Sequence, residues 1–153
     1  MKLDPKTPDR LIQAARRFDR IEQRFAEFKV ALDWFKDPQG PLRSVTIELG
    51  DDPRCITVSF ATIKVALRLL LVIPDSGIAT GQVICTKVLP KFGVVDRVLA
   101  SFTFDAQGRT SFVAGANDDP VEMEQHAVEI ALHFLELAVR PDELDSKQGN
   151  MAS

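Results

Sequence analysis

Residues 126–140 read HAVEIALHFLELAVR, and this stretch does most to decide the fold. Its polar side chains recur at intervals of three, four, three and four residues and are His126, Glu129, His133, Glu136 and Arg140. This spacing places them on one stripe of an α-helix, and all residues between them are apolar. An ordinary surface helix is apolar over little more than about 100°. We therefore expect this helix to be covered from more than one direction, by its own domain or by a second chain.

A second long helix is predicted from about Pro8 to Lys36. Its apolar residues step by three and four without a miss, as a heptad seam does: Leu11, Ala14, Phe18, Ile21, Phe25, Phe28, Leu32 and Phe35. A helix of this length spans ~43 Å, whereas strands of six to eight residues cover only ~20–26 Å. The helix should therefore overhang its sheet, kink or be covered by a partner. Val30 and Trp34 lie off the seam and widen its apolar surface.

Both helices have the same start signal. Thr7-Pro8 and Asp119-Pro120 each place a capping oxygen directly before a proline, whose missing N–H costs nothing at the first helical position. Glu122, three residues after Asp119, resembles the second half of a capping box. These signals predict that the last helix runs from about Pro120 to Val139.

Between the helices the apolar period changes to two, which is typical of strands. Strands are predicted at residues 44–49, 55–60, 78–89, 94–104 and 110–114. From Ile63 to Ile73 the apolar residues alternate in the opposite phase to those of 55–60. This shift at Ala61-Thr62 predicts a bulge or break in one long strand, and a short buried helix from Ala61 to Leu70 is the alternative. The expected fold is α+β, an antiparallel sheet of about five strands flanked by a long N-terminal helix and a C-terminal helix.

Size and composition indicate one globular domain. The chain has 153 residues, of which 45% are hydrophobic and 27% charged, with a net charge of −3. We expect a single domain over residues 1–141 and a disordered tail over residues 142–153. The chain start lacks the apolar run of a signal peptide, no stretch reaches transmembrane length, and Cys55 and Cys85 are too few for a disulfide framework. We therefore expect a cytoplasmic protein with two buried thiols, a single bridge being the alternative, and no membrane partner.

The charge is unevenly distributed along the chain. Residues 1–36 carry nine Lys/Arg and six Asp/Glu, whereas residues 118–153 carry two and nine. The basic first helix and the acidic last segment could attract each other within one chain or between two copies. Acidic residues are interleaved with the arginines of the first helix, which is not the pattern of a nucleic-acid-binding surface. We expect no nucleic-acid partner.

The polar stripe of the last helix is the one candidate metal site. Carboxylates and imidazoles suit zinc or iron, so the candidate ligands are His126, Glu129, His133 and Glu136. The more conservative interpretation is the one hydrated edge of an apolar helix, because no second acidic helix would supply the remaining ligands. The chain contains no nucleophile elbow, phosphate-binding loop, dinucleotide fingerprint or H-E-x-x-H pair. We therefore predict no catalytic residue and no cofactor.

The apolar excess favours a non-enzymatic protein-interaction module of the adaptor, chaperone, immunity or regulatory-subunit type. From Leu67 to Ile73 both faces of the predicted strand are apolar, so we expect both to be covered. We predict a homodimer that also binds another protein. The candidate contact residues are Val30, Trp34, Val128, Leu132, Leu135 and Val139. One alternative is a small-molecule binder with an apolar cavity between sheet and helices, and another is a metal-dependent enzyme that uses the stripe of the last helix.

The layout resembles that of type III secretion chaperones, which are small and acidic, with a helix first, an antiparallel sheet and an amphipathic helix last. The resemblance concerns architecture alone, and the helix that this family has within its sheet has no counterpart in the sequence pattern. It implies a chaperone-like role in binding another protein.

Overall fold

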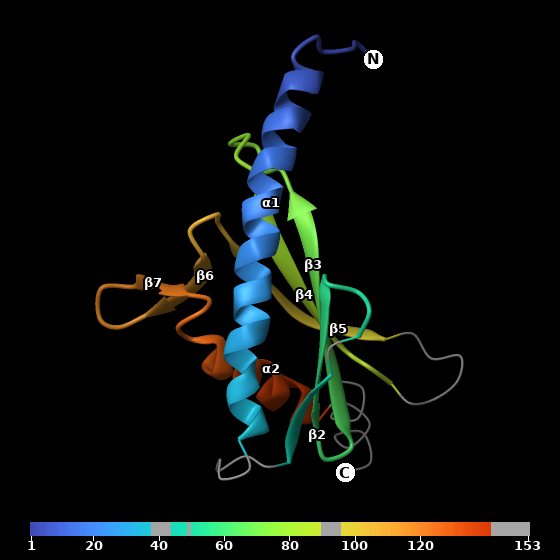
Figure 1. Cartoon of the computed structure of the whole chain (residues 1–153), viewed down its shortest axis with the longest axis vertical. Coiled ribbons are helices and arrows are strands. Elements are labelled where there is room, and N and C mark those ends of the chain that lie inside the picture. The colour runs from blue at the N-terminus through green and yellow to red at the C-terminus, as the bar shows by residue number, and fades with distance from the viewer. Residues whose placement is uncertain (38–43, 49, 90–95, 142–153) are drawn as a thin grey trace, which may run out of the picture.

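The computed structural model describes residues 1–37, 44–48, 50–89 and 96–141, so the tail predicted over residues 142–153 lies outside the described residues. The elements in chain order are α1 (Thr7–Ala31), the 3-10 helix η1 (Leu32–Lys36), β1 (Val45–Glu48), β2 (Cys55–Phe60), β3 (Ile63–Val72), β4 (Thr80–Lys87), β5 (Arg97–Phe104), β6 (Arg109–Ala114), β7 (Asp119–Glu122) and α2 (Ala127–Val139). The seven strands within the described residues form an antiparallel sheet in which each pairs with its sequence neighbour (Figure 1). The predicted α+β fold is confirmed, with seven strands instead of about five.

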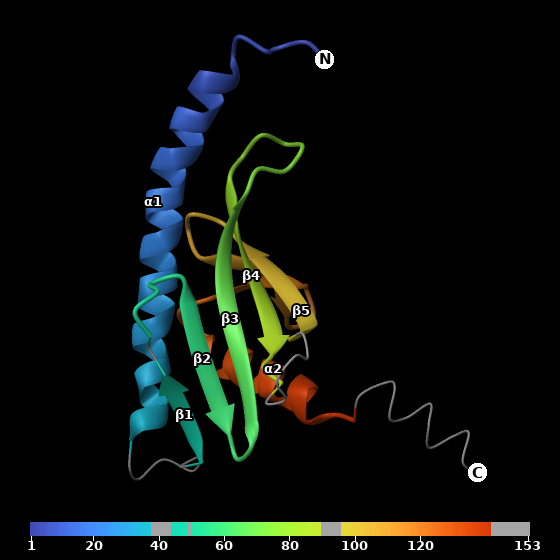
Figure 2. The same ribbon diagram turned by 90° about the vertical axis from the view of Figure 1, so that its right-hand side faces the viewer.

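The α1 helix and η1 bury most of the predicted seam. Its sheet-facing residues and those of η1 are almost inaccessible to solvent: Ala14, Ile21, Phe25, Phe28, Leu32 and Phe35. Of the three predicted outcomes for this long helix, the structure shows the overhang, because Leu11 and Ile12 are more than half exposed and the N-terminal turns project past the sheet (Figure 2). The predicted cap is wrong. Thr7 is the first helical residue, Lys6 occupies the N-cap without a side-chain bond, and Asp4 accepts a hydrogen bond from the Lys6 backbone N–H at 2.9 Å.

Residues 61–73 contain neither a bulged strand nor a short helix. Ala61 and Thr62 form a two-residue turn that reverses the chain, so β2 and β3 pair as an antiparallel hairpin with Phe60 opposite Ile63. Paired residues lie on the same face of a sheet, and Val58 therefore shares the helix-facing side with Val65. A two-residue turn moves the inward positions from even to odd numbers, which explains the phase shift in the sequence.

The predicted start of the last helix at Pro120 is wrong as well. Residues Asp119–Glu122 form the edge strand β7, in which Pro120 lies opposite Val113. Proline is tolerated on an edge strand because its missing N–H breaks no ladder to a further strand. The helix begins at Ala127, with His126 at the N-cap and no side-chain capping bond.

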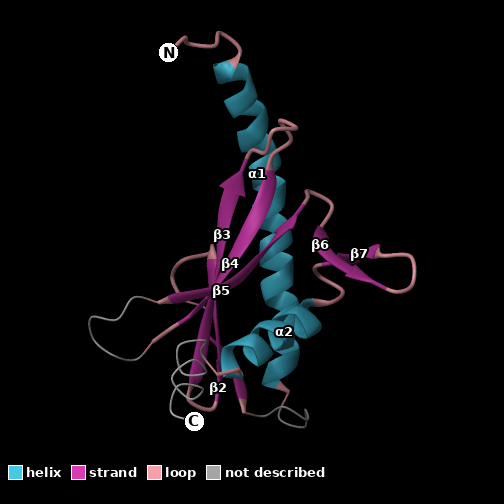
Figure 3. Ribbon diagram, turned by 180° about the vertical axis from the view of Figure 1, so that it is seen from behind, coloured by secondary structure: helices cyan, strands magenta, loops and turns pink. Residues whose placement is uncertain are grey.

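Both helices pack on the same side of the sheet. The α2 helix lies against β2, β3, β5 and η1 and also touches α1, close to the C-terminal end of that helix (Figure 3). Its buried residues are Ala127, Ile130, Ala131, Phe134, Leu135 and Ala138, so its own domain covers it from several directions, as expected. The core between the layers is filled by large side chains such as Phe25, Phe28, Phe104 and Phe134.

The opposite sheet face is not covered by a helix within the part of the chain that the structure describes. Arg68 on this face is exposed, and Leu70 keeps 47% of its surface accessible. Leu71 and Ile73, near the tip of the β3–β4 hairpin, are also exposed because the hairpin extends away from the packed core. The helices cover one face of this strand, and cover of the other face by a second copy or an apolar ligand stays a prediction.

Candidate functional site

An apolar groove lies between α2 and the edge of the sheet formed by β1 and β2. Its floor is the paired residues Val45 and Phe60, which share the helix-facing side of the sheet. Its wall comes from Leu132, Leu135 and Val139. The volume is about 400 Å³. We call this hollow the α2 groove.

The spacing of α2 explains why three apolar side chains reach the same groove. Leu132, Leu135 and Val139 are separated by three and four residues, so they lie on one face of the helix. Leu135 is buried, Leu132 is half-buried, and Val139 at the open end is 54% exposed. The apolar surface of the groove is therefore continuous with the core at Leu135 and open to solvent at Val139.

A polar pair borders the α2 groove. Glu136 and Arg140 both line it, and a guanidinium nitrogen of Arg140 lies 3.1 Å from a carboxylate oxygen of Glu136. Both side chains are largely exposed, so solvent screens the pair and its effect on stability is small. The Arg140 guanidinium can donate hydrogen bonds and the Glu136 carboxylate can accept them beside an otherwise apolar surface.

Three of the six predicted contact residues line the α2 groove, namely Leu132, Leu135 and Val139. Val128 is half-buried and packs against the core instead. Val30 on α1 is 69% exposed and Trp34 on η1 is 45% exposed, and neither lines the groove. Even so, η1 packs against both β1 and α2, so Trp34 belongs to an element that adjoins the groove.

Sequence reasoning missed the floor of the groove. Val45 and Phe60 could have been found only from the register of β1 and β2, in which they are direct partners. Because Ala61-Thr62 was predicted to be a bulge or break in one long strand, or the start of a short helix, Phe60 was not placed beside a hairpin turn.

The predicted polar stripe of α2 is divided between two surfaces. His126, Glu129 and His133 border a small hollow of about 190 Å³ with Phe112, whereas Glu136 lies at the α2 groove. The centroids of the His133 and Phe112 rings are 5.5 Å apart in an edge-on arrangement. Among the described residues, no three His, Cys, Asp or Glu side chains form a group that could hold a metal ion.

A backbone contact occupies one nitrogen of His126. Its Nδ1 lies 3.2 Å from the backbone carbonyl oxygen of Glu122. This contact follows from the place of His126 at the helix start, where the chain leaves β7 and turns into α2.

The two cysteines are free thiols with different surroundings. Cys55 at the start of β2 is half-buried, whereas Cys85 on β4 is buried in the core. Burial raises the pKa of the Cys85 thiol to about 12, because the apolar surroundings disfavour the thiolate. A thiol that stays protonated at neutral pH is a poor nucleophile, so Cys85 is a core residue.

Comparisons with models of known protein families, with curated proteins and with solved structures found no match. Within the part of the chain that the structure describes, no helix is both long and apolar enough to span a membrane.

Proposed function

We propose that this chain is a non-enzymatic protein-interaction module, of the adaptor, chaperone, immunity or regulatory-subunit type. It works as a homodimer and docks an apolar segment of a partner protein. The observation that carries the proposal is the α2 groove, whose wall and floor are made almost entirely of apolar side chains.

The groove has the features of a surface that receives an amphipathic segment. Such segments insert side chains spaced at i, i+3 or i+4 and i+7 into an apolar groove, and α2 presents Leu132, Leu135 and Val139 at matching intervals. Trp34 on the adjoining η1 adds an exposed aromatic side chain, a residue type that is enriched in protein interfaces. The Glu136–Arg140 pair can orient polar groups of the partner.

Peptide selection tests this proposal without knowledge of the natural partner. Short random peptides displayed on phage are selected on the native chain and counter-selected on the Val139→Lys variant. Val139 is exposed, and a cation suits the C-terminal end of a helix, so this variant should fold normally. We expect peptides with helically spaced apolar residues that bind the native chain at least about tenfold more tightly than the variant.

The matched control is Val98→Lys, which changes a valine on β5 that is also exposed and lies outside the groove. Peptides selected on the native chain should bind this control equally well. Selected peptides that bind the native chain and Val139→Lys with equal affinity would contradict docking in the α2 groove.

The homodimer has its own test. Light scattering coupled to size-exclusion chromatography gives the mass in solution, and a purely monomeric species throughout the micromolar range would contradict self-association.

The α2 groove also favours a second candidate function, the binding of a small apolar molecule. Its volume of about 400 Å³ falls within the range of about 300–1,000 Å³ that is common for small-molecule pockets. Native mass spectrometry after gentle purification should then show a bound mass that Val139→Lys loses. Protein that is consistently free of ligand would leave the docking of a protein segment as the function of the groove.

A further inference from the structure

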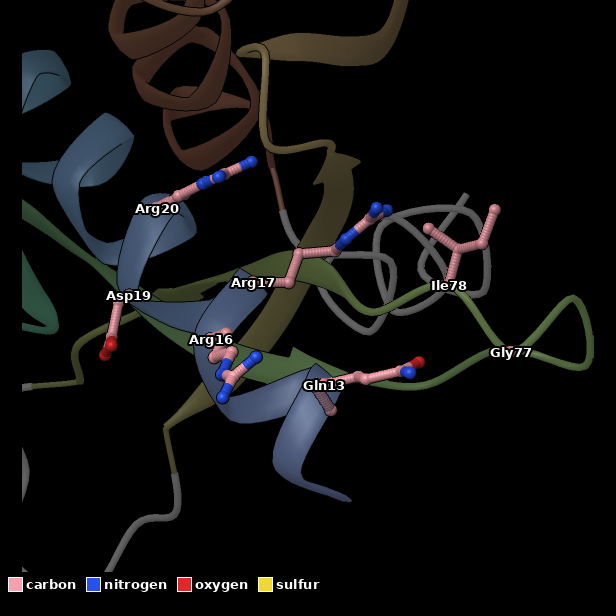
Figure 4. Close-up of a pocket in the computed structure, with 8 residues that line it drawn as sticks. Gln13, Arg16, Arg17, Asp19, Arg20, Gly77 and Ile78 are labelled. Atoms are coloured by element: carbon pink, nitrogen blue, oxygen red, sulfur yellow. The ribbon is translucent and has the colours of Figure 1, made fainter. Parts of the chain in front are cut away.

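A second groove lies at the N-terminal half of α1, beside the turn that joins β3 to β4. The helix contributes Arg16, Arg17 and Arg20, and the turn contributes Gly77 and Ile78 (Figure 4). The volume is about 630 Å³. We call it the arginine groove.

The three arginines have no ionic partner among the described residues. Neighbouring arginines do have partners: Arg10 pairs with Asp4, Arg24 with Glu27 and Arg54 with Glu22. Arg16, Arg17 and Arg20 make no such contact within the described part of the chain.

The arginine groove keeps a positive charge. Among the described residues that line it, Asp19 is the one acidic residue, and its side chain points away from those of Arg17 and Arg20 (Figure 4). The described lining therefore carries three cations and one anion, and this positive excess attracts a ligand of negative charge.

The arrangement of the guanidinium groups indicates which anion fits. In Figure 4 the side chains of Arg16, Arg17 and Arg20 end at separate places and do not meet at one point. A single phosphate is held best by donors that converge on its oxygens. Separated guanidiniums match several carboxylates that are spread over a protein surface, and the exposed Ile78 on the neighbouring turn offers an apolar contact beside them.

The same chain carries a surface of the opposite charge. The β6–β7 hairpin projects sideways from the body of the molecule (Figures 1 and 3). Asp118 in its turn, Asp119 at the start of β7 and Glu124 just beyond β7 are all exposed. None of these three carboxylates forms an ion pair with a described residue. We call this surface the acidic hairpin.

We propose that the arginine groove of one copy receives the acidic hairpin of a second copy, and that a twofold axis repeats the contact in the other direction. The inference rests on the homodimer of the proposed function and names its contact surfaces. Reciprocal contacts between the same two patches are what an isologous dimer requires. Complementary charges fix the orientation of the copies, and the exposed side chains of Ile78 and Val113 add apolar area. The α2 groove remains free for the partner protein.

Charge reversal with complementation tests this arrangement. One variant carries Arg17→Glu and Arg20→Glu, and a second carries Asp119→Lys and Glu124→Lys. Sedimentation equilibrium gives the dimer dissociation constant of each variant alone and of their equal mixture. We expect each variant alone to dimerise at least about tenfold more weakly than the native chain, because like charges then face each other. Mixing should restore a heterodimer of native affinity, since both reciprocal contacts then again join opposite charges.

A control variant carries Lys36→Glu and Arg68→Glu, two exposed positions outside the arginine groove. Its net charge changes by the same amount as that of the variant with Arg17→Glu and Arg20→Glu. It should dimerise like the native chain. Circular dichroism of all variants separates lost dimerisation from lost folding, and native mass spectrometry identifies the heterodimer by its mass.

Three outcomes would overturn the proposed dimer contact. The first is native dimerisation by the variant that carries Arg17→Glu and Arg20→Glu, and the second is a mixture no tighter than either variant alone. The third has two parts. The native chain stays monomeric, and inorganic triphosphate binds the native chain but does not bind the variant that carries Arg17→Glu and Arg20→Glu. None of these outcomes bears on the proposal that the α2 groove binds a partner segment, because peptide selection with Val139→Lys tests that proposal separately.

Discussion

Gly81 lies on β4 beneath α1, at a position with no room for a side chain. A Cβ atom there would lie 2.6 Å from Cε1 of Phe104 and 2.7 Å from Cγ2 of Ile21. Both neighbours are buried, so they cannot move aside freely. We expect Gly81→Ala to lower the free energy of unfolding by about 1–3 kcal/mol, measured by urea denaturation.

Gly50 provides the control for this change, because apart from its chain neighbours no described residue has an atom within 4 Å of the Cβ that Gly50→Ala would add. The control should stay within about 0.5 kcal/mol of the native chain. Equal stability of the two variants would contradict the close approach of α1 to β4. The sequence pattern did not single out Gly81, because a close contact between distant segments leaves no local signal.

Cys85 should resist alkylation in the folded chain. Burial raises its pKa from the ordinary 9.0 to about 12, so almost no thiolate exists at pH 8. We expect iodoacetamide at that pH to leave Cys85 unmodified in native protein and to modify it in urea, with peptide mapping by mass spectrometry as the measurement. The half-buried Cys55 serves as the internal comparison. Rapid modification of Cys85 under native conditions would mean that the core opens readily.

The same shift sets a direction for stability against pH. Above pH 9 the unfolded chain releases the Cys85 proton while the folded chain keeps it until about pH 12. The unfolded state therefore binds fewer protons in this window, and the contribution of Cys85 to stability falls as pH rises. Replacing Cys85 by alanine should flatten that part of the pH profile.

The α1 helix divides into a buried part and a projecting part. Phe28 is fully buried in the core, whereas Leu11 belongs to the same seam and is 56% exposed. We expect Phe28→Ala to destabilise the fold by about 3–5 kcal/mol, and Leu11→Ala to change it by less than about 0.5 kcal/mol. Thermal and urea unfolding measure both. A large loss from Leu11→Ala would show that the projecting turns are covered in solution.

The strands show where sequence periodicity reaches its limit. The apolar seam of α1 and the alternation in β2 were predicted correctly, because each follows from a regular period within one element. The Ala61-Thr62 turn was missed because it lacks the glycine or asparagine that marks tight hairpins. The strand β7 was missed because Asp119-Pro120 and Glu122 imitate the start of a helix.

The backbone of the missed turn can be tested directly. Ala61 adopts a positive φ of 52°, a conformation that costs an L-residue with a side chain roughly 1–2 kcal/mol. Glycine adopts it freely, so we expect Ala61→Gly to raise the free energy of unfolding by up to about 1 kcal/mol. Thr62→Gly, next to it, serves as the comparison and should not stabilise the fold. A loss of stability in Ala61→Gly would contradict the hairpin geometry.

At the scale of the whole molecule, the candidate surfaces combine residues that are distant in sequence. The helix side of the α2 groove was predicted from the apolar excess of α2, since Leu132, Leu135 and Val139 recur at helical spacing. Its floor depends on the pairing of β1 with β2, which places Val45 opposite Phe60. The arginine groove joins α1 to the turn after β3, and only the packing of α1 along the sheet brings the two together.

The two grooves differ in chemistry, so ionic strength distinguishes their roles in self-association. Attraction between exposed charges weakens as salt shortens the Debye length from about 10 Å at 0.1 M to about 3 Å at 1 M. We expect the dissociation constant of the native dimer to be at least about tenfold higher at high salt than at low salt, measured by sedimentation equilibrium.

The Val139→Lys variant should keep this salt dependence, because Val139 lies in the α2 groove and outside the arginine groove. The variant with Arg17→Glu and Arg20→Glu should show the opposite dependence, because salt then screens a repulsion between like charges. If the native dimer instead tightens as salt rises, self-association is due to the exposed apolar side chains, because excluded salts strengthen apolar burial.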